Sequence, residues 1–390
     1  MIPKVLRNPW VALTAIIFAA GGYSTYLRFA KGLGASTNLS DQFPWGIWIG
    51  FDVLCGVGLA AGGFTICALV HILRLKKYAP LARPAVLTAF IGYVLVVGGL
   101  LFDLGHPWRI WHPLVMWNPH SVMFEVAWCV MAYTTVLAAE VSVLFFEKFR
   151  MRRMTKIMHA ATLPLSILAV LLSMLHQSSL GSLFLIVPGR LHELWYTPLL
   201  PLLFFTSAMG AGLAVAIVES NLSARGFGHD LPRPALLGAA RLAAGILSLY
   251  LVIRFADLLR TGALLHLRFD ERATWFFLLE ITVGFVIPII YFASPAVLHN
   301  RRTLYRAAQL CLLGFIINRL NVSVTGFEVV SGHTYVPAWT EVAVTITIIT
   351  AGVWAVYFAE RYLPVLEAHP AEPEWRWKGE PATKLAWRGA

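Results

Sequence analysis

Ionisable side chains in this sequence lie inside long apolar runs, and they gather toward one end of those runs. A charge in the middle of a bilayer costs roughly 2.5–3.5 kcal/mol on insertion scales, so such residues are candidates for function. The richer end holds Asp52, Asp103, His106, Glu125, His176, Arg254, Asp257, Glu280 and Arg319. The opposite end holds Glu140, His159, Glu219 and Arg241, most of which can extend to the interface. The skew indicates proton or redox chemistry near one membrane surface.

Quinone chemistry would use such a set, because it needs a hydrogen-bond partner at each carbonyl and a group that exchanges protons. Side chains that offer these functions are His176, Gln177, Asp52, Glu125 and His106, with Trp45, Trp48 and Phe102 able to pack against a ring. Two structural interpretations stay open. His176 can be a helix-end histidine bonded to the backbone, and Arg254 can form an ion pair with Asp257 or Glu280 instead of a proton relay.

A b-type haem is the alternative cofactor, because histidines from facing helices can ligate haem iron. His106 and His176 lie at similar depth, and so do His71 and His159. His71 and His159 are close to basic loop ends, where histidine is common, and His106 precedes Pro107. We therefore expect quinone rather than haem.

Neither a metal site nor nucleic-acid binding is indicated. The four cysteines, Cys55, Cys67, Cys129 and Cys311, lie in apolar runs without Cys-x-x-Cys or zinc-type histidine spacing. Iron–sulfur clusters need grouped thiolates, so we expect buried apolar cysteines. The net charge of +11 sits in short loops between apolar runs rather than along one face, as nucleic-acid binding would require.

Membrane-spanning helices must position these residues. The chain has 390 residues, 58% of them hydrophobic and only 13% charged, whereas soluble domains carry roughly 25% charged residues. A span needs about 20 apolar residues. We predict an all-α polytopic membrane protein whose transmembrane domain covers 1–364, followed by an unstructured cytoplasmic tail at 365–390. The predicted spans are 10–30, 47–73, 84–105, 121–147, 156–178, 197–220, 234–259, 274–294, 303–320 and 340–362.

Basic residues predict the orientation, since cytoplasmic loops carry an excess of Lys and Arg. Most of the 31 Lys and Arg residues fall on the side that holds both termini. This pattern places both termini in the cytoplasm of a bacterial inner membrane. The outer loops are long and rich in Trp and Tyr, which favours a docked protein partner over an interfacial aromatic belt alone.

A weak internal repeat groups the helices. The third span ends near Asp103 and the fourth carries Glu125, while the seventh ends near Asp257 and the eighth carries Glu280. We interpret helices 2–5 (47–178) and 6–9 (197–320) as two four-helix bundles related in parallel and flanked by helices 1 and 10. Chance similarity between apolar helices is the competing explanation.

Several segments resemble a known family. The segment 43–52, with the sequence FPWGIWIGFD, resembles the second span of the NrfD/PsrC family, and 174–182, with the sequence MLHQSSLGS, is similar to its most distinctive stretch. Further similar segments are 121–125, Arg254-Phe255 and 335–341. The resemblance covers about 35–365 and is strongest to the HybB-type, ten-helix quinone-reactive subunits of hydrogenase-2-type complexes.

The resemblance implies a membrane anchor that passes electrons to menaquinone or ubiquinone. Its implied partners are a four-cluster ferredoxin-like iron–sulfur subunit on the outer face and the large and small subunits of a nickel–iron hydrogenase. The family's polar residues correspond to Asp52, Asp103, Glu125 and His176 in the first bundle and to Arg254 and Glu280 in the second. Asp257 stands where hydrogenase relatives carry Glu.

We expect Glu125 and His176 to act as the quinone-proximal acid and ligand. Asp52 and Asp103 would lead protons inward, and Arg254, Asp257 and Glu280 would form a second relay, with proton translocation as a further option. Two rival hypotheses are a haem-bearing b-type cytochrome subunit and a secondary transporter. Helices broken at matching positions of the two bundles would favour the transporter.

Overall fold

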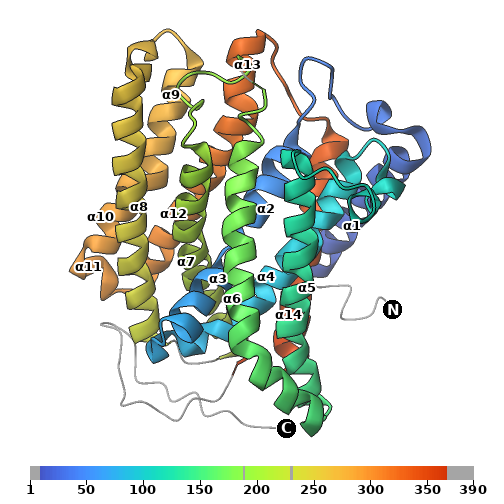
Figure 1. Ribbon diagram of the computed structural model, residues 1–390, viewed down its shortest axis with the longest axis vertical. Coiled ribbons are helices and arrows are strands. Elements are labelled where there is room, and N and C mark those ends of the chain that lie inside the picture. Colours follow the sequence, from blue (N-terminus) through green and yellow to red (C-terminus); the bar gives the residue numbers. More distant parts are fainter. Residues whose placement is uncertain (1–8, 188, 229–231, 367–390) are drawn as a thin grey trace.

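Helices make up the fold of the described part of the chain. The computed structural model describes residues 9–187, 189–228 and 232–366, and these contain no strand (Figure 1). Among them, 10 helices are long and apolar enough to cross a membrane. This confirms the predicted all-α class with ten spans. The predicted tail at 365–390 lies almost wholly outside the described residues.

Seven of the spans are built on one continuous α-helix. These helices are α1 (Pro9–Lys31), α4 (Ala79–Asp103), α5 (Val122–Lys148), α6 (Arg152–Ser182), α7 (Leu200–Phe227), α8 (Arg233–Thr261) and α14 (Trp339–Tyr362).

The other three spans are interrupted by π-helical segments, which carry the labels η3, η4, η9 and η10. The second span consists of η3 (Trp48–Val53), α2 (Leu54–Leu59), α3 (Gly62–Cys67) and η4 (Ala68–Ile72). The eighth consists of α9 (Arg272–Leu279), η9 (Glu280–Val286) and α10 (Ile287–Ala293), and the ninth of α12 (Arg301–Leu320), η10 (Asn321–Thr325) and α13 (Gly326–Ser331).

Contacts between the helices close two rings of four. In the first ring α4 packs on α3 and α5, α5 packs on α6, and α6 returns to α3 and η4. In the second ring α7 packs on α8, α8 on α10, and α12 on both η9 and α7. α1 and α14 pack on each other and α14 also packs on α4. These contacts are compatible with the two predicted bundles, but α7 also packs on α6 and α3. The division into two bundles and their relation as a parallel repeat stay predictions.

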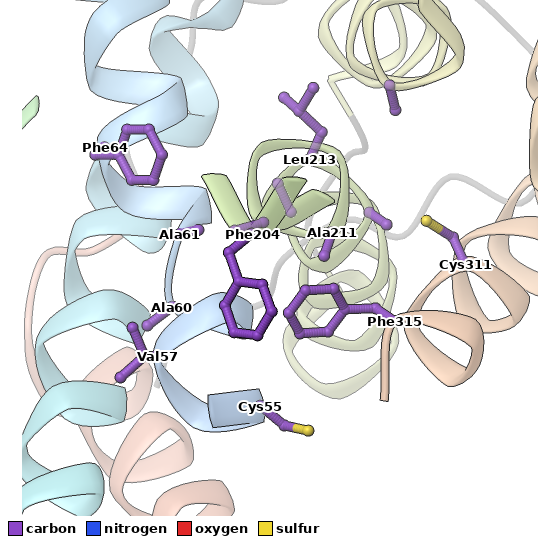
Figure 2. Packing of buried hydrophobic residues seen from close by; sticks show 14 of the residues in the cluster. Cys55, Val57, Ala60, Ala61, Phe64, Phe204, Ala211, Leu213, Cys311 and Phe315 are labelled. Carbon is purple, nitrogen blue, oxygen red and sulfur yellow. The ribbon is translucent and has the colours of Figure 1, made fainter. Parts of the chain in front are cut away.

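Small residues allow the two rings to touch. A Cβ atom at Gly212 of α7 would clash with the backbone of Ala61 and Gly62, so the second span and α7 meet backbone to backbone. Figure 2 shows the neighbouring core, where Phe204 of α7 and Phe315 of α12 lie beside the second span. Such small-residue contacts are typical of helix packing in membranes, where close backbone approach replaces the hydrophobic driving force.

The two ends of the molecule differ. We call the end at which α1, α4, α6 and α8 finish the aromatic face; its loops are 32–47, 104–121, 183–199, 262–271 and 332–338, and it lies at the top of Figure 1. We call the opposite end, with loops 73–75, 149–151 and 294–300, the basic face. Most of the candidate residues lie in the half next to the aromatic face.

Several predicted boundaries differ from the structure. The third span begins earlier, and α4 ends at Asp103, so His106 lies in a loop and not at a helix end. α6 continues to Ser182, which places Gln177 inside the helix. The ninth span continues beyond 320 to Ser331, because Asn321 and Ser323 donate to backbone carbonyls of the bundle and polar residues therefore do not end the helix.

Candidate functional site

Glu125 begins the candidate site at the aromatic-face end of the first ring. Ser121 caps α5 by accepting a hydrogen bond from the Phe124 backbone nitrogen, which puts Glu125 in the first turn. Its Oε1 accepts a hydrogen bond from Ser179 Oγ of α6 at 2.6 Å. The Glu125 side chain is only partly buried. A carboxylate in this position is fixed between two helices and can still be reached from outside the bundle.

His176 lies one turn from Ser179 on α6 and is fully buried at 0% exposure. Its ring centroid is 5.7 Å from that of Tyr93. Neither imidazole nitrogen has a hydrogen-bond partner among the described residues. The alternative of a helix-end histidine bonded to backbone is therefore wrong. A buried polar atom without a partner is uncommon and points to an occupant or a transient role.

Gln177 faces the second span and not the same space as Glu125. Its Nε2 donates to the Val57 carbonyl at 3.1 Å. Val57 belongs to α2, just before the interruption at Ala60 and Ala61 that separates α2 from α3. Gln177 thus holds α6 against the interrupted helix, which is a structural role that sequence reasoning did not separate from quinone binding.

The two tryptophans expected to pack a quinone ring point to different neighbours. Trp45 lies 5.7 Å from the Phe184 ring and 6.0 Å from the Phe327 ring, so it fills the aromatic face between the two rings of helices. Trp48 donates from Nε1 to the Glu341 carbonyl of α14 at 3.2 Å. Trp45 can line a ligand site at the aromatic face, whereas Trp48 belongs to the contact with α14.

Asp52 and Asp103 face the flanking helices. Asp52 Oδ2 accepts a hydrogen bond from Thr345 of α14 at 2.8 Å. Arg28 of α1 donates to the carbonyls of Phe102 and Leu104 on either side of Asp103. The sequence predicted one cluster with Glu125 and His176; instead a hydrogen bond ties Asp52 to α14, and Arg28 of α1 holds the backbone on either side of Asp103, whose Oδ1 has no partner among the described residues.

Further polar residues lie where the first ring contacts α1 and α14, and the sequence did not identify them as site residues. Glu341 is 0% exposed, and its Oε1 accepts a hydrogen bond from the Tyr335 hydroxyl at 2.5 Å. Burial raises the pKa of Tyr335, which keeps that hydroxyl protonated. Arg28, predicted at the outer end of the first span, is 3% exposed within α1. Glu341 lies in the segment 335–341, which resembles the family, so this resemblance could have identified Glu341 from the sequence.

The second ring holds its own polar network, centred on Glu280 of η9. Glu280 is 0% exposed and accepts hydrogen bonds from Trp195 Nε1 at 2.8 Å, Asn318 Nδ2 at 2.6 Å and Asn321 Nδ2 at 2.8 Å. Acceptance at both oxygens fits an ionised carboxylate. Trp195, Asn318 and Asn321 were missed as site residues, although Asn318 stood out in an apolar span.

Arg254 and Asp257 on α8 do not form the ion pair that was one structural alternative to a proton relay. Arg254 donates from Nη2 to the Leu194 carbonyl. Asp257 pairs with the exposed Arg260 at 3.0 Å. Arg319 of α12 donates to the Phe204 carbonyl and to Ser207 Oγ at 3.0 Å each and lies over the Phe204 ring. The second ring thus places two buried guanidiniums beside a separately bonded carboxylate.

His106, expected to bind a cofactor, is exposed in the loop after α4 and packs on Trp108 at 5.1 Å between ring centroids. It shares no contact with His176 among the described residues. The loop position is a consequence of the end of α4 at Asp103. The predicted role of His106 in cofactor binding stays a prediction.

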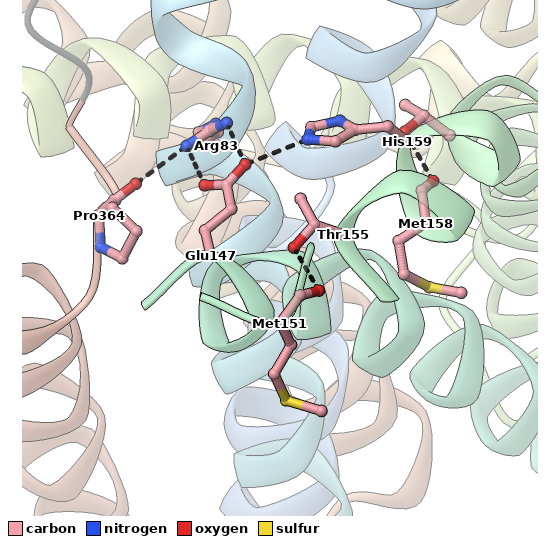
Figure 3. A network of polar contacts seen from close by, with 8 residues as sticks. Arg83, Glu147, Met151, Thr155, Met158, His159 and Pro364 are labelled. Atoms are coloured by element: carbon pink, nitrogen blue, oxygen red, sulfur yellow. Dashed lines mark hydrogen bonds and ion pairs between the residues drawn. The ribbon is translucent and has the colours of Figure 1, made fainter. Parts of the chain in front are cut away.

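At the basic face, hydrogen bonds join the helices away from the candidate site. Arg83 of α4 donates to both oxygens of Glu147 at 2.9 and 3.0 Å and to the Pro364 carbonyl, and His159 lies 3.2 Å from Glu147 (Figure 3). His71 Nδ1 lies 2.8 Å from Ser166 Oγ. Each histidine of the inner pair considered for haem has a hydrogen-bond partner of its own.

The fold and burial define an integral multi-pass membrane protein with polar sites inside its helix rings. The family profile described as polysulphide reductase, NrfD, matches residues 35–331. The chain therefore belongs to the NrfD family, as its sequence motifs predicted.

Three relatives cover almost the whole chain. A protein of Nitratidesulfovibrio vulgaris is 40% identical over 94% of this chain and 97% of its own length. The probable Ni/Fe-hydrogenase 2 b-type cytochrome subunit of Escherichia coli is 30% identical over 93% of this chain and 92% of its own. The menaquinone reductase integral membrane subunit of N. vulgaris is 29% identical over 94% and 92%. The two relatives with descriptive names are subunits of redox complexes.

Proposed function

We propose that this chain is the quinone-reactive membrane anchor of a respiratory oxidoreductase complex in a bacterial inner membrane. The observation that carries the proposal is the pair formed by His176 and Glu125. A buried imidazole with two nitrogens that lack partners among the described residues lies one helical turn from a serine that fixes a partly exposed carboxylate. The names of the relatives, a hydrogenase subunit and a menaquinone reductase subunit, support the same class of activity.

The site residues fit the chemistry of a quinone headgroup. Its carbonyl oxygens accept hydrogen bonds, which a protonated Glu125 or the imidazole N–H of His176 can donate, while the Ser179 hydroxyl is already bonded to Glu125. Reduction to quinol takes up two protons with two electrons. Glu125 can hold one of these protons at its carboxyl oxygen and exchange it with the surface, since it is bonded to Ser179 and not sealed in the core.

Electrons would arrive from an iron–sulfur partner at the aromatic face. Several large apolar side chains are exposed there, including Trp108 at 67%, Trp117 at 65% and Phe269 at 67%. Tryptophan-rich exposed surface is typical of protein interfaces. We propose a four-cluster ferredoxin-like subunit in this place, joined to the large and small subunits of a nickel–iron hydrogenase, with both termini of this chain in the cytoplasm.

Proton movement would use the acids that face α1 and α14. Asp52 is bonded to Thr345 of α14, and Asp103 is bracketed by the hydrogen bonds of Arg28 from α1. We propose that these acids conduct protons away from the quinone site, with Glu341 as an added member.

The relay predicted for the second ring is smaller than the sequence indicated. Arg254 and Arg319 hold fixed positive charge, because a guanidinium does not release its proton in proteins. Of the three residues of the predicted relay, Glu280 and Asp257 remain as groups that could exchange protons, and Asp257 is paired with Arg260.

The rival functions are less well supported by the geometry. A bis-histidine haem would need facing imidazoles, and the exposed loop position of His106 offers none to His176. A transporter would favour interruptions at matching places in the two rings. The second span is interrupted while its counterpart α7 is continuous, and the eighth is interrupted while α5 is continuous. An optical spectrum of the purified complex decides the haem question, and we expect no Soret band.

The test of the quinone site is Glu125→Gln in the assembled complex. We expect quinone-linked turnover to fall by roughly 100-fold, in the range of losing one general acid–base group, while electron transfer to a soluble dye that bypasses this subunit is retained. Asp41→Asn, at an exposed residue of the same face, is the matched control. Full quinone-linked turnover in Glu125→Gln would show that the acid lies elsewhere.

A further inference from the structure

The second ring encloses a small cavity near the aromatic face. Its wall contains Arg254, Arg319, Tyr250, Asn318 and Trp195 together with apolar side chains of α7 and η10. The cavity has a volume of about 10 Å³, measured as the space open to the centre of a water molecule. A single water needs roughly 10–15 Å³ by the same measure. The cavity therefore suits one small occupant.

Hydrogen-bond donors without acceptors line this cavity. Arg254 is 2% exposed, and its Nε and Nη1 have no partner among the described residues. Arg319 is 1% exposed, and its Nε likewise has none in the described part of the chain. Leaving a buried donor unsatisfied costs roughly 1–3 kcal/mol, and more when the group is charged. These three nitrogens require an acceptor.

Positive charge in the cavity exceeds negative charge. No carboxylate of the described residues is within ion-pair distance of Arg254 or Arg319, and Asp257 is paired with Arg260. Glu280 is linked to Arg319 only through Asn318, which donates to Glu280 and accepts from Arg319. Two guanidiniums thus face one carboxylate. An uncompensated charge inside a membrane protein is costly, so a negative occupant is favoured.

A water molecule would meet few acceptors here. The Leu194 and Phe204 carbonyls and Asn318 Oδ1 each already accept one hydrogen bond from the two arginines, which leaves a single lone pair on each oxygen. Tyr250 Oη already accepts from Asn318 at 3.2 Å. Water must donate its two hydrogens as well as accept, whereas a monatomic anion only accepts. We propose that the cavity binds a single halide-sized anion, with chloride as the available ion, held by Arg254 and Arg319.

The proposal is tested by thermal unfolding of the purified complex at constant ionic strength. Sodium gluconate is compared with sodium chloride and sodium bromide, since gluconate is too large for the cavity. We expect the halides to raise the unfolding midpoint of the membrane subunit by about 2 °C in a saturable way, as ligand binding to the native state does. Arg254→Gln should abolish this shift, and Arg241→Gln, at an exposed arginine of the same helix, should keep it.

Bromide anomalous scattering gives a second measurement that does not depend on a variant. In crystals of the complex grown with bromide, we expect a peak within hydrogen-bond distance of Arg254 and Arg319. Equal midpoints in gluconate and halide, or ordered density without anomalous signal, would overturn the proposal in favour of water. A halide shift that survives in Arg254→Gln would place the ion elsewhere. The inference and the proposed function can fail separately. A complex with quinone-linked activity but no halide site would overturn only this inference. A complex with a halide site but no quinone-linked activity would count only against the proposed function.

Discussion

The two rings of helices bury polar groups in opposite ways. In the first ring, Glu125 has one side-chain partner and remains partly exposed, and His176 has none among the described residues. In the second ring, Glu280 is fully buried with three donors. Glu125 is partly exposed and can exchange a proton with its surroundings, whereas Glu280 would have to break its hydrogen bonds inside the core. His176 is buried and therefore costly to charge, so it can act only as a neutral donor or acceptor.

This difference separates a site of exchange from a site of fixed charge. In the first ring the unsatisfied groups lie next to a partly exposed carboxylate, as proton transfer to a membrane carrier would require. In the second ring the buried arginines and the amide side chains of α12 and η10 hold the helices in place. Four predictions test this difference, in order of decreasing effect.

Glu280→Leu should destabilise the protein most. The substitution leaves the buried donors of Trp195, Asn318 and Asn321 without an acceptor, which costs roughly 1–3 kcal/mol for each donor. We therefore expect the free energy of unfolding to fall by about 3–5 kcal/mol. The matched change Glu125→Leu removes a single partner and should cost about 1 kcal/mol. Yield and unfolding midpoint of the complex measure both. Equal losses would contradict the distinction between the rings.

His176→Phe should reduce quinone-linked turnover by roughly 100-fold with little change in the unfolding midpoint. The imidazole makes no hydrogen bond to the described residues that the phenyl ring would forfeit, and the ring stays among apolar neighbours such as Tyr93. A structural histidine would give the reverse pattern, with stability lost and turnover kept. The split between the two measurements therefore tests the role of this residue.

Gly314→Ala should destabilise the second ring by about 1–3 kcal/mol, because its Cβ would clash with the Gly284 backbone across the contact of α12 with η9. Gly212→Ala should do the same at the contact between the rings. Gly245→Ala is the control, since no atom lies within 4 Å of its added Cβ. Thermal unfolding measures all three, and a neutral Gly314→Ala would show that these helices can separate easily.

Lower pH should loosen the loop between α6 and α7 slightly. Burial lowers the pKa of His192, against an opposing effect of Glu271, and Nδ1 accepts from the Leu194 nitrogen at 3.2 Å. The folded loop binds the proton less well than the unfolded chain, so its stabilisation is present above pH of roughly 6.5 and is lost as the pH falls below that value. Hydrogen exchange of 190–197 should increase accordingly.

The control for this last effect is His192→Asn, which keeps a side-chain acceptor for Leu194 but does not titrate. Its exchange should change only with the intrinsic pH dependence of amides. If wild type and variant respond alike between pH values of about 7.5 and 5.5, on either side of the ordinary histidine pKa, another group controls the loop.

Hydropathy and loop charge were enough to predict the ten spans, because length and apolarity alone define a span. The separation of Asp52 and Asp103 from Glu125 was not predictable in that way, since it depends on which face of each helix meets α1 or α14. Trp195 and Glu341 come from loop and helix-start positions far along the chain from Glu280 and Trp48. Only the folded arrangement brings such residues to one place.

The π-helical segments η3, η4, η9 and η10 affect how this chain tolerates length changes. Each residue of a regular helix turns the next by roughly 100°, so a π turn accommodates one extra residue without rotating the rest of the span. Deleting one residue within such a segment can revert it to an ordinary turn and leave its neighbours in phase. The same deletion in α7 would rotate half the span, so insertions and gaps among homologous chains should concentrate at these segments.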